Sequence, residues 1–270
     1  MAPKTSRLRG KLSVPPTGPD SGFLTADGQR LEYRWFGGRS PSAIVVLHEG
    51  LGCISTWKKF PDRLAAAVGR PVFAYSRSGY GGSDPVELPR PATYMHHEGE
   101  VVLPQVLDAA GIEEAVLVGH SDGGSIAIVR TGLGDPRVRR LVLIAAHVFN
   151  EPLSRETIEE VGRRFRETDL RERLERHHGD NVECAFWGWH DVWRSDEFQR
   201  WNLEEFLPSI TVPTLVVQGA DDNFGTLAQV DVIVAGVSGP VQRVMIPECG
   251  HSPHKDQPDT LIETIARFLS

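Results

Sequence analysis

Short apolar runs alternate with amphipathic segments along most of the chain. The apolar runs suit strands that are buried on both faces of a sheet, and they lie at residues 43–47, 71–75, 115–118, 138–146, 213–218 and 242–246. Segments with apolar residues at helical spacing follow them, at 57–68, 94–110, 125–132, 225–234 and 258–269. Because strand alternates with helix, the pattern predicts an α/β fold with a mostly parallel sheet covered on both faces.

Two local signals refine this pattern. An Asp27-Gly28 turn separates residues 23–25 from residues 30–35, which predicts a hairpin ahead of the first parallel strand. Pro104 falls inside the helix expected at 94–110, where it lacks an N–H and is expected to kink the helix.

The alternation stops between residues 147 and 210. Arginine and glutamate dominate residues 151–176, and residues 184–206 are rich in aromatic side chains. This stretch predicts a helical insertion rather than more sheet. The expected organisation is an N-terminal arm at 1–21, a core formed by 22–146 and 211–270, and a helical cap at 147–210.

The run at 115–118 leads directly into a Gly-x-Ser-x-Gly motif centred on Ser121. A serine at a sharp turn between strand and helix is a nucleophile elbow, which exposes the hydroxyl above the sheet. Gly119 and Gly123 lack a Cβ, so strand and helix can approach closely. The N–H of Asp122 would lie at a helix N-terminus, where a developing oxyanion is stabilised. The motif also occurs by chance, so the prediction depends on partner residues elsewhere.

Loops after other predicted strands supply those partners, because such loops converge on one site in a parallel α/β sheet. Asp221 and Asp222 follow the strand at 213–218, and His251 follows the strand at 242–246. The chain order Ser, Asp, His is the order expected for an elbow serine. The residues alone leave open which aspartate serves.

These loops together resemble those of the α/β-hydrolase family, from about residue 22 to the end. The matching segments are 48–52 (His-Glu-Gly-Leu-Gly), 78–83 (Ser-Gly-Tyr-Gly-Gly-Ser), 119–123, 219–222 and 250–251. The resemblance implies that Ser121 attacks a carbonyl and forms an acyl-enzyme, with His251 as base. It places the orienting acid at Asp222 and leaves Asp221 as a turn or capping residue. A helical cap at this point of the chain also fits the family.

The oxyanion loop departs from the family pattern at Glu49, where many relatives have glycine. The resemblance implies that backbone N–H groups of Glu49 or Gly50 act together with the N–H of Asp122. Two interpretations of the Glu49 side chain stay open. It bonds to the framework away from the site, or it places a carboxyl near the site, paired with Arg77. The side chain of Asp122 has the same two alternatives.

Three further histidines lie near these motifs. His254 is expected to be a surface residue of the His251 loop and is the alternative base. His120 occupies the variable position of the elbow and is expected to point away from the nucleophile. His48 is expected to brace the oxyanion loop.

Tryptophan is dense in the predicted cap, at positions 187, 189, 193 and 201. Most of these rings suit the cap core. One or two of them are expected to line an apolar pocket over Ser121 for an acyl or aryl group, and the candidates are Trp187, Trp189 and Trp193. A group of other side chains could be drawn as a metal site, but its spacing fits no common zinc pattern; its members are His177, His178, Cys184 and His190. No metal and no other cofactor is expected.

Composition narrows the function classes. The chain has 270 residues, of which 40% are hydrophobic and 24% charged, and its net charge of −7 argues against a nucleic-acid partner. No apolar run reaches about 18 residues, and the N-terminus lacks the apolar region of a signal peptide, so no membrane segment is expected. Three scattered cysteines are too few for a disulfide framework. The expectation is a cytoplasmic protein, monomer or homodimer, that acts on a small molecule.

The sequence is compatible with three functions. The first is a serine hydrolase that cleaves a small ester, thioester or amide-like bond, with a carboxylic ester as the leading expectation. The second retains the triad but cleaves a carbon–carbon bond, as meta-cleavage product hydrolases of this fold do. The third is a non-catalytic small-molecule receptor, since some receptors on this fold retain a complete triad.

Overall fold

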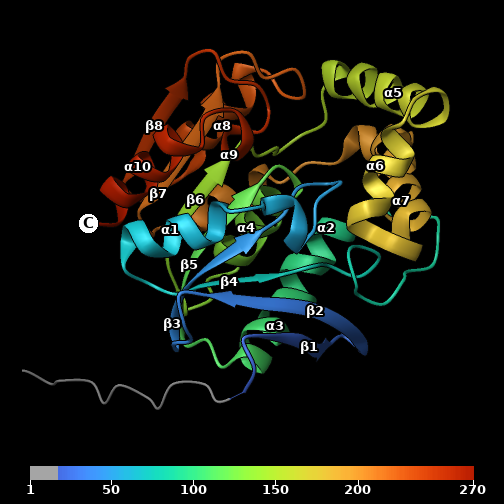
Figure 1. Cartoon of the computed structure of the whole chain (residues 1–270). Helices are drawn as coiled ribbons and strands as arrows, with labels where there is room; N and C mark the ends of the chain where they lie inside the picture. The colour runs from blue at the N-terminus through green and yellow to red at the C-terminus, as the bar shows by residue number, and fades with distance from the viewer. Residues whose placement is uncertain (1–17) are drawn as a thin grey trace, which may run out of the picture.

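A single sheet organises the molecule. The computed structural model describes residues 18–270, so the predicted N-terminal arm at 1–21 lies almost entirely outside the described residues. Within the described part of the chain, the strand order is β1-β2-β4-β3-β5-β6-β7-β8 (Figure 1). The strands are β1 (Ser21–Ala26), β2 (Gln29–Phe36), β3 (Ser42–Leu47), β4 (Val72–Tyr75), β5 (Glu114–His120), β6 (Val138–Ile144), β7 (Thr214–Gly219) and β8 (Val241–Ile246).

The predicted α/β fold with a mostly parallel sheet is confirmed. Strands β3 to β8 pair in parallel, whereas β1 pairs with β2, and β2 with β4, in antiparallel fashion. The predicted hairpin is therefore the antiparallel edge of the sheet. Its two-residue turn at Asp27-Gly28 has positive φ at both positions, as such hairpins require.

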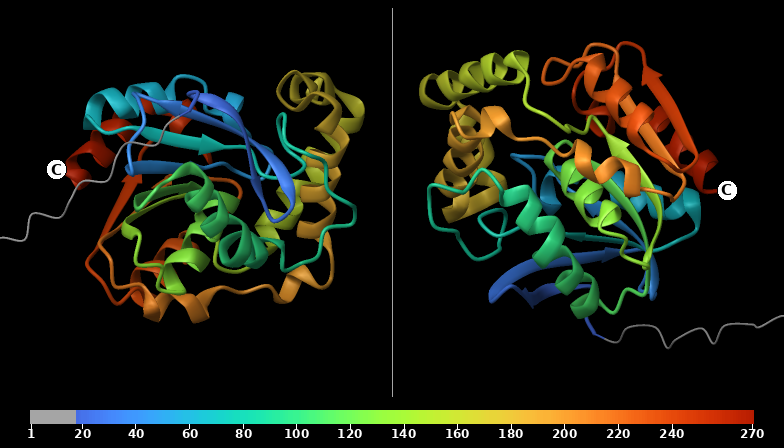
Figure 2. Two further views of the ribbon diagram at one scale, coloured as in Figure 1. Left: turned by 90° about the horizontal axis from the view of Figure 1, so that it is seen from below. Right: turned by 180° about the vertical axis from the view of Figure 1, so that it is seen from behind.

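Helices cover both faces of the sheet, and alternate strand residues supply the two cores (Figure 2). Val45 and Leu47 of β3 belong to one core, and Ile44 and Val46 to the other, because successive side chains of a strand point to opposite faces. The core helices are α1 (Phe60–Val68), α2 (Tyr94–His97), α3 (Leu103–Ala110), α4 (Asp122–Gly132), α8 (Leu227–Gly236), α9 (Pro253–Asp256) and α10 (Pro258–Leu269). Among the described residues, no helix combines the length and the apolar character needed to cross a membrane.

The helix expected at 94–110 is interrupted in a way that accommodates Pro104. A π-helical turn, η2 (Glu98–Val102), separates α2 from α3. Pro104 lies directly after this turn, at the start of α3, and the Leu103 N–H before it donates to the Glu98 carbonyl across the turn. The irregular turn therefore precedes the proline, and the helical run continues through it.

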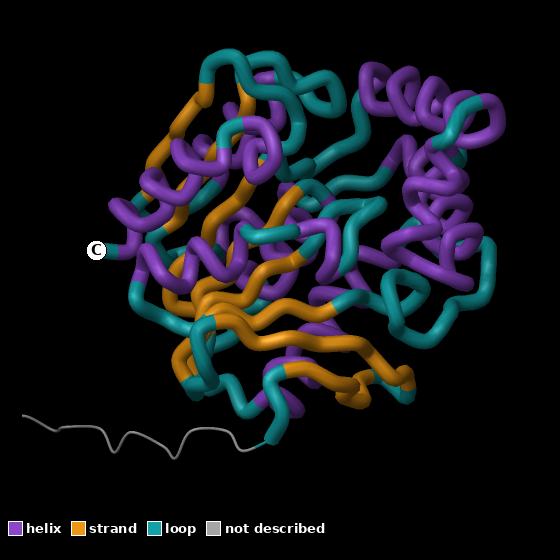
Figure 3. The backbone as a smooth tube through the Cα atoms, in the orientation of Figure 1, coloured by secondary structure: helices purple, strands orange, loops and turns teal. Residues whose placement is uncertain are grey.

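Three helices between β6 and β7 form a separate group beside the sheet (Figures 1 and 3). They are α5 (Pro152–Glu167), α6 (Leu170–His178) and α7 (Val182–Arg194), followed by short 3-10 turns. Helices α5 and α7 pack against each other through Phe165 and Phe186, whose ring centroids are 3.6 Å apart. These helices occupy the stretch in which the sequence predicts a helical cap.

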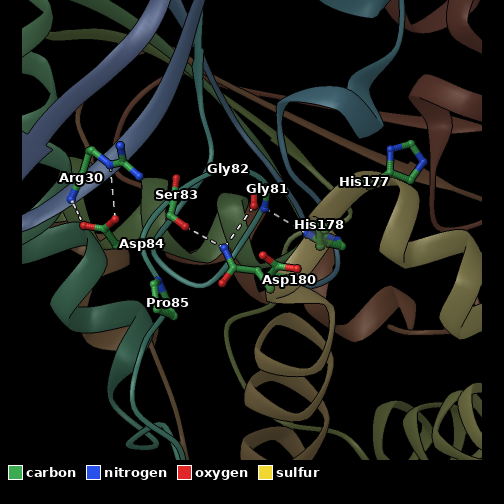
Figure 4. A pocket seen from close by; sticks show the side chains of 11 residues that line it. Arg30, Gly81, Gly82, Ser83, Asp84, Pro85, His177, His178 and Asp180 are labelled. Carbon is green, nitrogen blue, oxygen red and sulfur yellow. Dashed lines mark hydrogen bonds and ion pairs between the residues drawn. The ribbon is translucent and has the colours of Figure 1, made fainter.

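Hydrogen bonds tie this helical group to the glycine-rich loop after β4. The N–H of Gly81 donates to Nδ1 of His178 at 3.1 Å, and the Asn181 amide donates to the carbonyls of Gly81 and Ser83 at 3.1 and 2.7 Å. These contacts lie in a cavity of about 620 Å³ that Figure 4 shows from close by. Ser121 is not among its lining residues.

Candidate active site

Ser121 lies at the sharp turn between β5 and α4. Its φ of 53° and ψ of −120° are unusual for a residue other than glycine and indicate local strain. The turn is also tight. A Cβ on Gly119 would lie 2.3 Å from the Gly123 carbonyl oxygen, and a Cβ on Gly123 would lie 2.1 Å from the Leu47 carbonyl oxygen. The motif glycines are therefore required by backbone packing.

The loops after β7 and β8 bring Asp222 and His251 together. Nδ1 of His251 lies 2.9 Å from each carboxylate oxygen of Asp222. Burial alone would raise the pKa of Asp222, but hydrogen bonding and charge from His251, with the N–H of Phe224, hold that pKa below its ordinary value. Asp221 is exposed instead, and its N–H donates to the Cys249 carbonyl. The structure thus distinguishes the two aspartates.

Ser121 and His251 line one cavity of about 220 Å³. Its apolar walls come from Leu51, Ile158, Val161, Leu170, Trp189, Trp193 and Phe224, and its polar walls from Glu49, His147, Ser154, Arg164, Ser252 and Lys255. No hydrogen bond joins the Ser121 hydroxyl to the His251 ring among the described residues. In many sites of this kind that contact tightens only when substrate binds.

Two of the three candidate pocket tryptophans, Trp189 and Trp193, line this cavity, and Trp187 does not. Trp189 and Trp193 are four residues apart on α7 and so share one face of the helix. Trp187 lies on another face, packs against Phe165, and donates its indole N–H to Glu183. Helical spacing could have separated these three rings.

Trp189 also explains why residue 50, in the loop after β3, is a glycine. A Cβ on Gly50 would lie 2.2 Å from the indole nitrogen of Trp189. The α7 helix therefore reaches the loop that follows β3, and only glycine fits at that contact. The backbone of Gly50 and the wall of the cavity are consequently coupled.

Buried hydrogen bonds fix the backbone of this loop. The N–H of Arg77 donates to Nε2 of His48 at 3.1 Å, so Nδ1 of His48 carries the proton and donates to the Glu49 carbonyl at 2.7 Å. The Arg77 guanidinium donates to the carbonyls of His48 and Glu49 at 2.6 and 3.2 Å. Burial, followed by the charge of Arg77, lowers the pKa of His48 well below its ordinary value. His48 thus braces the loop.

The carboxylate of Glu49 lies at the cavity wall, and its ion-pair partners are Lys255 and His120 rather than Arg77, the partner considered in the second interpretation. Lys255 Nζ lies 3.0 Å from Oε1, and Nδ1 of His120 lies 3.5 Å from Oε2. Burial alone would raise the pKa of Glu49, whereas Lys255 and His120 bring it well below its ordinary value. The sequence could not reveal Lys255 as the partner, because the two residues are 206 positions apart.

His254 is buried rather than a surface residue, which corrects the sequence expectation. Only 5% of it is exposed, and its ring packs against Trp57 and His120 at 4.7 and 4.9 Å between centroids. His120 is fully buried and is not among the residues that line the cavity. Its Nε2 lies 2.7 Å from the carbonyl oxygen of His251. Both rings therefore lie beneath the loop that carries His251.

The side chain of Asp122 turns away from Ser121 into a buried network. Arg77 Nη2 lies 3.7 Å from its carboxylate, and Tyr94 donates a hydrogen bond to it. The indole N–H of Trp193 donates in turn to the Tyr94 hydroxyl at 3.1 Å. Of the two sequence interpretations, the structure shows the framework contact. As the first residue of α4, Asp122 has a backbone N–H without a partner inside the helix.

The fold agrees with comparisons to known proteins. A sequence model of the alpha/beta hydrolase family matches residues 44–264, and the chain belongs to that family. It is similar to Serine hydrolase BPHL of Mus musculus, at 25% identity over 98% of this chain and 94% of that protein. It is also similar to 2-hydroxymuconate semialdehyde hydrolase of Pseudomonas sp. (strain CF600), at 28% identity over 96% and 95% of the two chains.

Solved structures support the fold. The enol-lactonase from Burkholderia xenovorans LB400 superposes with a TM-score of 0.68 at 20% identity, covering 92% of this chain and 99% of that one. VinJ gives a TM-score of 0.68 at 24% identity, with 92% and 97% of the chains covered. At these identities the likeness shows the fold alone. Family membership and the relatives' names support a hydrolase.

Proposed function

We propose that the protein is a serine hydrolase that cleaves a small ester, thioester or amide-like bond through an acyl-enzyme on Ser121. One observation carries the proposal: His251 is held by Asp222 through Nδ1 and lines the same cavity as Ser121. Oriented in this way, the ring has its other nitrogen available for the serine proton. Metal chemistry is not part of this proposal.

Each residue has one role in the proposed reaction. Nε2 of His251 takes the proton of the Ser121 hydroxyl as Oγ bonds to the substrate carbonyl carbon. His251 then gives that proton to the leaving group, and water releases the acid by the same route in reverse. Asp222 remains ionised, because its pKa is below the ordinary value, and it stabilises the imidazolium.

Backbone N–H groups would receive the charge that develops on the carbonyl oxygen. The N–H of Asp122 at the start of α4 is one candidate, and that of Glu49 or Gly50 is the other. The carboxylate of Glu49, at the wall of the same cavity, would repel the negative charge of an oxyanion. Lys255 balances the Glu49 charge at 3.0 Å, so the loop can serve despite its departure from the family pattern.

The cavity favours a small substrate. Its volume of about 220 Å³ is below the ~300–1,000 Å³ typical of pockets for drug-sized ligands. Leu51, Trp189 and Trp193 supply apolar wall, which suits a short acyl or aryl group. Larger acyl chains would require displacement of α7.

A carbon–carbon bond hydrolase of the meta-cleavage type is the second candidate. Two relatives at 27% and 28% identity are named as hydrolases of 2-hydroxy-6-oxononadienedioate and of 2-hydroxymuconate semialdehyde. Arg164 and Lys255 line the cavity, and such cations suit the carboxylate of a dienoate substrate. The same triad serves both reactions.

A substrate panel separates these functions. Purified protein is assayed on p-nitrophenyl acetate and longer esters, and in parallel on a 2-hydroxy-6-oxo-dienoate, each with Ser121→Ala as the control. Turnover of short esters that disappears in Ser121→Ala supports the first proposal. Higher kcat/KM on the dienoate selects the second. No turnover of either class, with ligand binding retained by Ser121→Ala, contradicts both and favours the receptor.

A further inference from the structure

A second cluster of chemistry-bearing side chains lies beneath the candidate active site. Glu49 follows β3, His120 ends β5, and His254 lies at the start of α9. One potential ligand atom from each lies within 4.8 Å of the other two. His120 is fully buried and His254 is 5% exposed. Three segments that are distant in sequence therefore meet at one buried point.

The hydrogen bonds of this cluster are incomplete. Nε2 of His120 lies 2.7 Å from the His251 carbonyl oxygen, which only accepts, so Nε2 carries a proton, and in the neutral ring Nδ1 presents a lone pair. Nδ1 faces Oε2 of Glu49 at 3.5 Å, an ion-pair contact when the ring is protonated, and neither atom has a hydrogen bond in the described part of the chain. Both ring nitrogens of His254 also lack one. Buried polar atoms without partners are costly, so this cluster requires an explanation.

We propose that Glu49, His120 and His254 form a binding site for Zn²⁺. Two imidazoles and one carboxylate are a common donor set for this ion. Ligands at about 2.0–2.1 Å in a tetrahedron lie roughly 3.4 Å apart, and Nδ1 of His120 is already 3.5 Å from Oε2 of Glu49. The ligand nitrogen of His254 lies within 4.8 Å of the other two ligand atoms, so this ring would have to move closer to reach the same spacing, and a solvent molecule would complete the coordination.

The neighbouring charges are compatible with an ion at this point. Lys255 contacts Oε1 of Glu49 at 3.0 Å, which leaves Oε2 for the ion. The proton on Nε2 of His120 is held by the His251 carbonyl, which fixes the tautomer that presents Nδ1. The rings of Trp57 and Phe60 cover the His254 side of the cluster.

The four residues that the sequence suggested as a metal group do not compete for this role. His177 contacts the Ser55 hydroxyl, His178 contacts the Gly81 N–H and the Leu51 carbonyl, His190 contacts Asp191, and Cys184 contacts the backbone of Val86. The proposal departs from the sequence expectation of no metal. Spacing within one segment cannot detect ligands that come from three distant segments.

An ion at this position would join the parts of the candidate active site. Its ligands lie on the loop with the oxyanion donors, next to Ser121 in the elbow, and on the loop with His251. Zn²⁺ bound at this point is expected to fix these three segments relative to one another and to raise the melting temperature of the protein. The inference does not depend on the proposed function, because binding and melting are measured without a substrate.

The test uses the full chain after dialysis against a chelator and then against metal-free buffer. Zn²⁺ is titrated calorimetrically, and Co²⁺ is added separately to report coordination geometry by its visible spectrum. We expect one Zn²⁺ per chain, a tetrahedral Co²⁺ spectrum and a higher melting temperature. Glu49→Gln and His254→Gln should each weaken binding at least about tenfold.

Two controls make the result specific. His97→Gln replaces an exposed histidine that pairs with Asp27, and it should bind as the wild type does. His251→Gln tests whether the ion binds at the candidate catalytic base instead. Binding that is lost in His251→Gln yet retained in Glu49→Gln and His254→Gln overturns the proposal. So does an absence of binding by wild-type protein whose circular dichroism shows it folded.

Discussion

At the scale of single residues, the assignment of the acid depends on Asp222 and Asp221, which are adjacent in sequence but differ in environment. Asp222 contacts His251 and the N–H groups of the following turn, whereas Asp221 is exposed. The motif pattern located Ser121 and His251 because each is marked by glycines and a strand end. It could not separate the aspartates without a family resemblance, since both follow the same strand.

This difference predicts unequal effects of two matched substitutions. Asp222→Asn should lower kcat on a p-nitrophenyl ester by roughly 10³- to 10⁴-fold, because the ring then loses its orienting carboxylate. Asp221→Asn should leave kcat within about twofold, as expected for an exposed side chain. Steady-state kinetics of the two variants provide the measurement. Equal losses, or a larger loss in Asp221→Asn, would contradict the assignment.

His147 gives a second residue-scale prediction, on stability. Burial, followed by the charge of His251, lowers its pKa to about 3. Its folded-state pKa thus lies below the unfolded value of about 6.5, so its contribution to stability is complete above pH 6.5 and is lost as the pH falls toward 3. The loss reaches about 2 kcal/mol by pH 5.

Substitution by a residue that does not titrate isolates this contribution. Between pH 8 and pH 5, the free energy of unfolding of wild-type protein should fall by about 2 kcal/mol more than that of His147→Phe. Urea denaturation at the two pH values measures this difference. An identical pH dependence of the two proteins would show that folding does not change the pKa of His147 and would contradict the prediction.

At the scale of elements, α5, α6 and α7 together contribute side chains to the cavity that Ser121 lines, and the aromatic rings among them come from α7. Aromatic density predicted a pocket wall in this segment, but only the positions four apart, Trp189 and Trp193, lie at the cavity. The sequence also predicted a helix at 94–110 with a kink at Pro104. The π-helical turn before Pro104 was not foreseen, because a proline indicates a break without showing which residues absorb it.

The two sides of α7 should respond differently to truncation. Trp189→Ala removes cavity wall and the contact with Gly50, and we expect kcat/KM for the best ester to fall roughly tenfold or more. Trp187→Ala removes a ring of similar size that does not line the cavity, and kcat/KM should stay near the wild-type value. Comparable losses in both variants would indicate that the effect arises from cap stability rather than from the pocket.

At the scale of the whole molecule, the arrangement of the sheet and the helical group α5 to α7 positions the candidate site. Alternating strands and helices were sufficient to predict a parallel α/β sheet. The pattern of apolar residues along the chain does not specify the strand order, because each buried strand has the same apolar pattern whichever neighbour it pairs with. The contacts between helical group and core were equally hidden, because Asn181 and Gly81 are separated by 100 residues.

Those contacts can be tested through stability. Asn181 is buried and donates two hydrogen bonds to the loop after β4, so Asn181→Ala leaves two carbonyls without their partner. The free energy of unfolding should fall by about 2 kcal/mol. Asn202→Ala, at an exposed position, is the control and should change it by less than about 0.5 kcal/mol. A change below that limit in Asn181→Ala would mean that the helical group is held by other contacts.

The central claim is that Ser121 is a nucleophile activated by His251. It is tested most directly by treating folded protein with a fluorophosphonate and mapping the adduct by peptide mass spectrometry. The account predicts one adduct, on Ser121, which is absent in Ser121→Ala and forms much more slowly in His251→Gln. An adduct that forms at the wild-type rate in His251→Gln, or folded wild-type protein that leaves Ser121 unmodified, would contradict it.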